Sequence, residues 1–101
     1  MRESVIAAPA SLNQATRIAF RDAALAALDA LRQEPGGRLV LDLSCTTRMD
    51  SSGLGALVVV QLRAAELRIG VLLRGASEEV RFLLLMTRLD ERFTFEPPAP
   101  A

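Results

Sequence analysis

The sequence predicts a single α/β domain with a mostly parallel or mixed small sheet and helices packed against it. Apolar segments as short as buried strands alternate along the chain with longer segments of helical period, which is the order that builds parallel sheets. At 101 residues, half of them apolar, the chain has the size of one ordinary domain. We expect the domain to span residues 1–96. Residues 97–101 are expected to be a disordered tail, because their prolines lack the amide that a sheet requires.

The first half of the chain predicts a strand, a helix and a second strand. Residues 4–8 form a short β-like segment, and Asn13 is expected to cap the helix that follows. Apolar residues at helical spacing predict the core face of that helix: Ile18, Phe20, Ala24, Leu25, Ala27, Leu28 and Leu31. Proline and glycine at residues 35–37 stop the helix. The nearly continuous apolar run at residues 39–43 then indicates an interior strand.

The second half predicts two further helices and two further strands. Residues 52–67 have a helical period, although the three valines at residues 58–60 favour a strand by propensity. Residues 69–73 are a buried strand, and Ser77 is expected to cap a helix over residues 80–89. The residues expected to be buried by that helix are Val80, Leu83, Leu84 and Thr87. A last short strand is predicted at residues 93–95.

Several residue types are absent, and their absence excludes whole classes of chemistry. The chain contains no histidine, lysine, tyrosine or tryptophan. A Ser-His-Asp triad, a Ser-Lys pair and a phosphate-binding P-loop therefore cannot be assembled, and one cysteine cannot hold a zinc ion. We expect no enzymatic turnover, no cofactor and no metal site.

The charge balance and the hydropathy of the chain limit the partners and the cellular location that we expect. Twelve acidic residues balance twelve arginines, so no overall positive charge draws the chain to nucleic acid. No apolar run approaches the roughly 18 residues that suggest a membrane span. We therefore expect no nucleic-acid binding, no membrane insertion and a cytoplasmic location. Cys45, Met49 and Met86 are interpreted as small or flexible apolar residues that are at least partly buried.

The stretch from Asp50 to Gly55, Asp-Ser-Ser-Gly-Leu-Gly, lies where a predicted strand leads into a predicted helix. The first amides of a helix lack partners within it, and its dipole favours negative charge there, so a carboxylate cap or a phosphate fits this position. Two interpretations stay open on local spacing. Asp50 or Ser51 caps the helix while Gly53 and Gly55 allow close packing, or the serines form a phosphorylation switch.

Two segments resemble the STAS domain of bacterial anti-sigma factor antagonists: Leu-Val-Leu-Asp-Leu-Ser at residues 39–44 and Met-Asp-Ser-Ser-Gly-Leu-Gly-Ala-Leu at residues 49–57. Residues 75–84 and 87–93 resemble the family's closing pattern, so the likeness covers about residues 5–96. It implies that the second serine, Ser52, accepts the phosphate. The partner-binding residues that it implies are Asn13, Asp50, Ser51, Ser52, Gly53 and Leu54.

The chain departs from this family before the first predicted helix. Ala-Ser-Leu-Asn at residues 10–13 stands in place of a Gly-Glu-Leu-Asp-like turn. Asn13 thus replaces an acidic residue that often accompanies the phosphosite. The departure leaves open whether the family's first strand is present.

The resemblance implies a role in bacterial signalling and transcription regulation by partner switching. The unphosphorylated protein binds a GHKL-type anti-sigma factor serine kinase and so frees a sigma factor. Phosphorylation of Ser52 reverses this, and a PP2C-type phosphatase restores binding. Two alternatives remain: a constitutive STAS subunit of a lipid-transport ATPase complex, and a STAS scaffold in a stress-signalling assembly.

Overall fold

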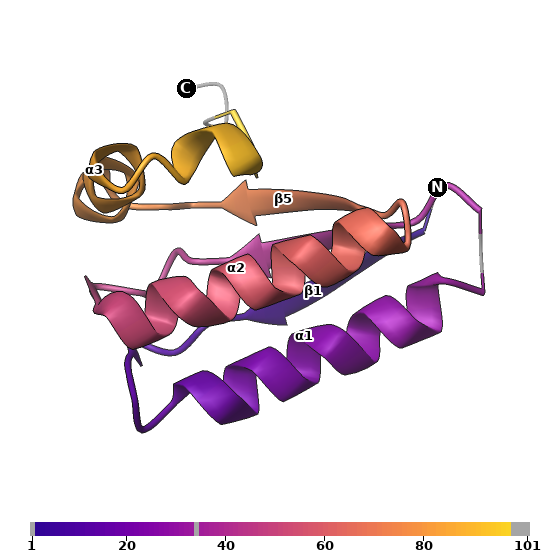
Figure 1. Ribbon diagram of the computed structural model, residues 1–101, viewed down its shortest axis with the longest axis horizontal. Coiled ribbons are helices and arrows are strands. Elements are labelled where there is room, and N and C mark those ends of the chain that lie inside the picture. Colours follow the sequence, from indigo (N-terminus) through magenta and orange to yellow (C-terminus); the bar gives the residue numbers. More distant parts are fainter. Residues whose placement is uncertain (1, 34, 98–101) are drawn as a thin grey trace.

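The computed structural model describes residues 2–33 and 35–97, in which strands and helices alternate along the chain (Figure 1). The elements are β1 (Glu3–Ala7), β2 (Ser11–Leu12), α1 (Arg17–Leu31), β3 (Arg38–Asp42), β4 (Arg48–Met49), α2 (Ser51–Glu66), β5 (Gly70–Arg74), α3 (Glu78–Met86), the 3-10 helix η1 (Asp90–Arg92) and β6 (Thr94–Phe95). The predicted α/β order is confirmed. From residue 98 onward, the expected tail lies outside the described residues.

The main sheet is parallel throughout. Its four strands lie in the order β1-β3-β5-β6, with Val5 beside Val40 and Val40 beside Leu72. A second, two-stranded parallel sheet pairs β2 with β4. The family's first strand, whose presence the sequence left open, is present in this chain. It is β1, and its five residues all pair with β3.

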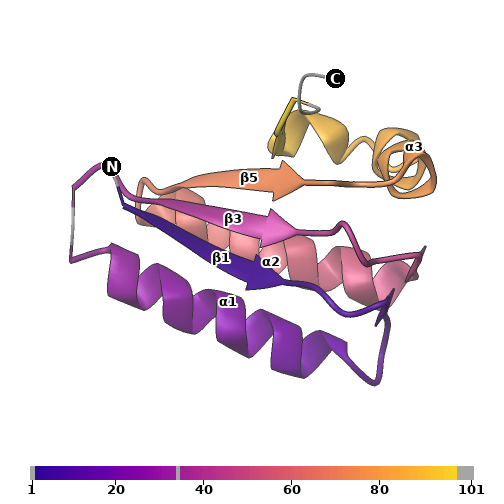
Figure 2. The same ribbon diagram turned by 180° about the vertical axis from the view of Figure 1, so that it is seen from behind.

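Helices α1 and α2 lie side by side across one face of the sheet (Figure 1). Seen from behind, the strands lie in front of α2, and α1 lies along the β1 edge (Figure 2). The core lies between the helices and the sheet, where large side chains from both layers are fully buried. Among them are Leu28, Leu31, Leu39, Leu41, Leu57 and Leu73. Their burial is the main favourable term that holds the layers together.

The valine run at residues 58–60 is helical, as its period predicted. The side of α2 that faces the core carries Leu54, Leu57, Val60 and Ala64 at spacings of three and four residues, the repeat of one helical face. A strand here would have turned alternate residues to solvent. Tertiary burial of the helical face therefore outweighs the β propensity of the valines.

The other face of the sheet carries ion pairs that join β1, β3, β5 and the residue after β6. Glu3 contacts Arg38 at 2.6 Å and Arg74 at 3.4 Å, and Arg74 contacts Glu96 at 2.9 Å. The hydrogen bond from Arg38 lowers the pKa of the Glu3 carboxyl group, and that with Glu96 raises the pKa of Arg74. These four charged side chains therefore pair with one another across the sheet.

The start of α1 differs from the prediction. The helix begins at Arg17, and Asn13 instead opens a turn in which its side-chain oxygen accepts bonds from the Ala15 amide at 2.9 Å and the Thr16 amide at 3.2 Å. The prediction that Asn13 caps α1 is therefore wrong. Ile18, predicted to widen the core face, is 41% exposed. Four residues of α1 are buried at spacings of three and four: Phe20, Ala24, Leu28 and Leu31.

The last helix is shorter and less buried than predicted. Ser77 caps α3 by accepting a bond from the Val80 amide at 3.2 Å, which confirms that prediction. The helix ends at Met86, and Thr87 is exposed with its hydroxyl donating to the Leu83 carbonyl oxygen at 2.8 Å. The burial expected of Thr87 is thus wrong, because its hydroxyl binds the end of the helix.

Two of the three sulfur-containing residues for which burial was predicted also differ from that prediction. Met86 is exposed, and so is Cys45. Met49, by contrast, packs against the core. Met86 lies on the side of α3 opposite its two buried residues, and Cys45 lies in the loop after β3, so neither side chain reaches the core. Composition alone could not separate these cases.

Candidate functional site

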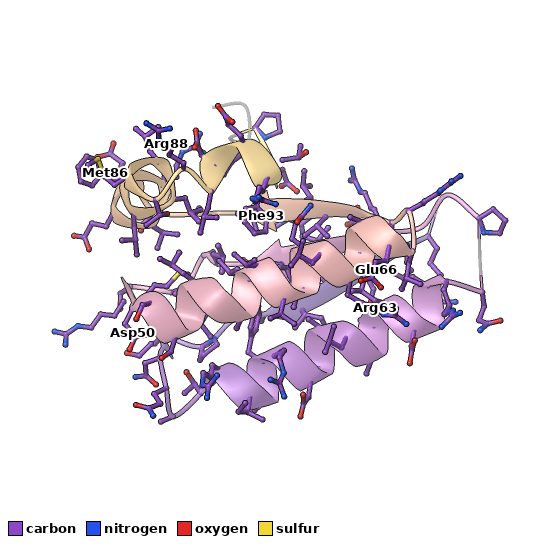
Figure 3. All side chains as sticks on the ribbon, viewed as in Figure 1. Asp50, Arg63, Glu66, Met86, Arg88 and Phe93 are labelled. Carbon is purple, nitrogen blue, oxygen red and sulfur yellow. The ribbon has the colours of Figure 1, made fainter. Side chains whose placement is uncertain are left out.

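Asp50 lies immediately before α2 and caps it (Figure 3). Its backbone is extended, its side-chain oxygen Oδ1 accepts a bond from the Gly53 amide at 3.1 Å, and its carbonyl oxygen accepts one from the Leu54 amide at 3.0 Å. The carboxylate therefore satisfies one of the first-turn amides and places a negative charge at the positive end of the helix. The cap interpretation of this residue is confirmed.

The two serines follow directly as the first residues of α2. Ser51 is exposed and Ser52 is half-buried. Within residues 2–33 and 35–97, no hydrogen-bond partner is found for either hydroxyl. Both hydroxyls are thus free to be approached from solvent.

Ser52 belongs to the outer face of α2. Gly55, Val59 and Leu62 continue this face at helical spacing, and all three are exposed. A Cβ atom on Gly55 would meet nothing within 4 Å. The surface one turn after Ser52 therefore carries no side chain of its own, and an approaching protein could reach the Ser52 hydroxyl without displacing one. Close packing as the reason for Gly55 is wrong.

Gly53 and Leu54 face the opposite way. Both are buried, and a Cβ atom on Gly53 would collide with the carbonyl oxygen of Leu12 and come within 2.9 Å of the Met49 side chain. The close-packing interpretation of Gly53 is confirmed. Both residues therefore pack α2 against the rest of the domain, and the partner contact expected of them stays a prediction.

Two loops distant in sequence are joined at this end of the molecule. The pairing of β2 with β4 sets Leu12 beside Met49, and the Asp50 amide donates to the Leu12 carbonyl oxygen at 3.3 Å. The buried Thr46 hydroxyl donates to the Pro9 carbonyl oxygen at 2.8 Å. These bonds hold the start of α2 against the segment that precedes α1.

A pocket of about 550 Å³ opens beside this junction. Both Asn13 and Asp50 line it, so the structure brings together two residues that the sequence could only name separately. Arg48 adds a positive charge to the lining, and α3 closes the other side with Glu79 and Phe82. Ser51 and Ser52 lie outside the lining residues. No local signal predicted the contribution of α3, because it depends on how distant elements pack.

The part of the chain that the structure describes has neither a metal-binding cluster nor a membrane-spanning helix. No three acidic or cysteine side chains gather there as a metal site requires. None of its helices has the length and apolar character needed to cross a membrane.

Comparison with protein families covers nearly all of the chain. The model of the family described as "Mlab, STAS domain" matches residues 2–96. The chain belongs to the STAS domain family. This assignment agrees with the α/β fold and with the position of the Asp-Ser-Ser-Gly stretch at the start of α2.

Solved structures include STAS-like folds from bacteria. One is a candidate anti-sigma factor antagonist from Thermotoga maritima, with a TM-score of 0.77 and 22% identity, covering 93% of this STAS domain and 80% of that chain. Another is a sulfate transporter family protein from Wolinella succinogenes, with a TM-score of 0.69 and 18% identity, covering 92% and 75% respectively. At these identities the likeness shows the fold alone. No curated protein matches the sequence.

Proposed function

We propose that this STAS domain is an anti-sigma factor antagonist that acts by partner switching. Its unphosphorylated form binds a GHKL-type anti-sigma factor kinase and frees a sigma factor, and phosphorylation of Ser52 reverses the binding. The observation that carries the proposal is the half-buried Ser52 hydroxyl, which has no partner among the described residues and lies on the outer face of α2 next to the bare surface at Gly55.

The proposed contact surface consists of Asn13, Asp50, Ser51 and Ser52. The first two line the pocket, and the serines start the adjoining helix. This surface combines a carboxylate, an amide and two hydroxyls. It suits a partner that offers hydrogen-bond donors and an uncharged pocket for the Ser52 hydroxyl. The domain acts as a binding module in the cytoplasm, and the chemistry belongs to its kinase and to a PP2C-type phosphatase.

Phosphorylation would change this surface mainly through charge. The kinase transfers the γ-phosphoryl group of ATP to Ser52 Oγ, releasing ADP and the hydroxyl proton. The product adds a charge of about −1.5 to −2 two residues from the Asp50 carboxylate. A kinase surface shaped for a neutral hydroxyl would then have to desolvate an anion beside a second anion, which opposes binding.

The same charge should leave the fold intact. The first turn of α2 offers a positive dipole end to an anion, and the Asp50 side chain accepts only from the Gly53 amide within it. Ser52 faces outward, away from the buried Gly53 and Leu54. The switch therefore needs no rearrangement of the core.

The test compares Ser52→Asp with Ser52→Asn, which has nearly the same shape without the charge. A pull-down from the source cells with the wild-type protein should recover a GHKL-type kinase identified by mass spectrometry. Titration calorimetry with that purified kinase should then give similar affinities for the wild type, Ser52→Ala and Ser52→Asn. Ser52→Asp should bind at least roughly tenfold more weakly, about 1.4 kcal/mol in binding free energy.

Gln33→Glu supplies the charge control, because it adds one negative charge at an exposed position just after α1. It should bind like the wild type, and all variants should unfold at nearly the same temperature. Equal affinities for Ser52→Asp and Ser52→Asn would rule out a charge switch. A phosphate mapped to Ser51 instead of Ser52 after incubation with kinase and ATP would move the site by one residue.

A constitutive subunit of a lipid-transport ATPase complex is the second candidate. It is favoured by the Asp50 cap, which gives the Asp-Ser-Ser-Gly stretch a structural role that needs no phosphate. In this case the pull-down should recover a transport ATPase with the wild type and with Ser52→Asp alike. Recovery of the kinase by the wild type alone would exclude this candidate.

A further inference from the structure

Arg17, the first residue of α1, has a side chain whose Nε atom is buried without a hydrogen-bond partner. Its guanidinium group forms no hydrogen bond or ion pair with any residue that the structure describes. Arg21, the next arginine of this helix, instead contacts the Asp22 carboxylate at 3.2 Å. A buried donor without a partner lowers stability, so Arg17 has an unused capacity to bind an acceptor.

Arg17 lies on the side of α1 that faces the sheet and α2. Ala24, seven residues further along the helix, is buried. Leu25, eight residues further along, lines the groove between the two helices together with Val59 of α2. Spacings of seven and eight residues return to one helical face. The Arg17 side chain is therefore directed between the helices, in agreement with the burial of its Nε atom.

Ser52 has the matching position on α2. The two helices pack on each other, begin at the same end of the domain and run in the same direction (Figure 1). Val59, which lines the shared groove, lies seven residues after Ser52. Two helical turns therefore lead back from this groove to Arg17 on α1 and to Ser52 on α2. The two residues occupy corresponding positions at the start of the helix pair, where Ser52 is half-buried.

The segments that precede the two helices are joined, and this fixes the correspondence. The pairing of β2 with β4 sets Leu12 beside Met49. Helix α1 starts five residues after Leu12, and α2 starts two residues after Met49. The Leu12 carbonyl oxygen also lies against Gly53, the residue that follows Ser52. The start of α1, with Arg17, is therefore tied to the first turn of α2.

We propose that Arg17 is the internal counter-ion of a phosphate on Ser52. Because this role requires the phosphorylation of Ser52, it rests on the function proposed above. A phosphate carries three acceptor oxygens beyond Oγ, and the guanidinium group binds such oxygens with two parallel, charge-assisted hydrogen bonds. In the unmodified domain neither Arg17 nor the Ser52 hydroxyl has a partner among the described residues. Phosphorylation would supply one to both.

The other charged groups at this end of the domain are less suited to this role. Arg21 already forms an ion pair within its own helix. Arg48 lines the pocket, and Ser52 is not among the residues of that lining. Asp50, two residues before Ser52, repels a phosphate. Phosphorylation would thus add negative charge to the contact surface and draw the free positive charge of Arg17 onto the phosphate.

The test places phosphoserine at residue 52 by genetic encoding, so that no kinase is needed. A phosphorus NMR titration then gives the second pKa of the phosphate, which is ordinarily about 6. A nearby positive charge favours the dianion and lowers this pKa. In Arg17→Gln the pKa should rise, and the phosphate should bind its proton roughly tenfold more tightly than in the wild type. Arg17→Lys keeps the positive charge and should stay close to the wild type.

Two controls separate this effect from a general loss of charge. Arg32→Gln removes the same charge just beyond the other end of α1 and should leave the pKa unchanged. Phosphoserine at residue 51, which is exposed, should respond to Arg17→Gln clearly less than phosphoserine at residue 52.

Three results would each overturn the proposal: equal pKa values in the wild type and Arg17→Gln, a pKa in Arg17→Lys as high as in Arg17→Gln, or an equal response at residue 51. None of these measurements uses the kinase. They can therefore fail while the partner switch holds, and the kinase titration can fail while they succeed.

Discussion

The two faces of α2 differ in what determines their residues. On the inner face, Gly53 lies against the Leu12 carbonyl oxygen and the Met49 side chain, so even one methyl group does not fit. On the outer face, Gly55 has open space where its Cβ would be, next to the half-buried Ser52. Two glycines only two residues apart in one motif therefore have different physical meanings.

Within this one short motif, packing requires one glycine, and no contact requires the other. Close packing requires glycine at residue 53, because α2 approaches the backbone of β2 there. No contact requires glycine at residue 55, where it costs the helix about 0.5–1 kcal/mol relative to alanine. What glycine does at residue 55 is keep the surface beside Ser52 bare. Substitutions on the two faces should consequently act in opposite directions.

The largest effect is expected for Gly53→Ala. The added methyl group must displace the Leu12 backbone or the Met49 side chain, and overpacking of this kind costs about 1–3 kcal/mol. Chemical denaturation should show the free energy of unfolding lowered by this amount. Unchanged stability would mean that α2 can move away from β2 at little cost, and the contrast between the two faces would fail.

A smaller loss is expected for Asp50→Ala, which removes the acceptor of the Gly53 amide. Loss of an N-cap side chain costs about 0.5–2 kcal/mol, measurable by the same denaturation experiment. Asp50→Asn keeps an acceptor and should stay close to the wild type. Ser77→Ala removes the matching cap of α3 and should cost a similar amount. If Asp50→Asn were as unstable as Asp50→Ala, charge rather than the hydrogen bond would be the main contribution.

The smallest effect has the opposite sign. Gly55→Ala places a methyl group in open space on an α-helix, so it should raise the free energy of unfolding by about 0.5–1 kcal/mol. Thermal unfolding of Gly55→Ala beside Gly53→Ala is the direct comparison of the two faces. A loss of stability in Gly55→Ala would show that the outer face has a packing requirement that its open space does not reveal.

Most of the fold could be predicted because its signals are local. The helical period of residues 52–67 outweighed three valines, and the caps at Asp50 and Ser77 each act over three residues. The wrong predictions concern residues whose local pattern fits more than one arrangement. Asn13 has a good capping side chain, but it satisfies the amides of Ala15 and Thr16 in a turn before α1 begins. Apolar character likewise could not show that Met86 would point to solvent.

The sequence by itself determined the order of the helices and of the four strands in the main sheet, the caps at Asp50 and Ser77, and the serines at the start of a helix, because these depend on neighbours along the chain. Only the tertiary structure decided which glycine is sterically required, since the backbone atoms against Gly53 belong to Leu12 in β2, about forty residues earlier. It also brought Asn13 and Asp50 into one pocket and left one side of α3 uncovered. Pairing and packing between distant segments set these features, and no local pattern in the sequence records them.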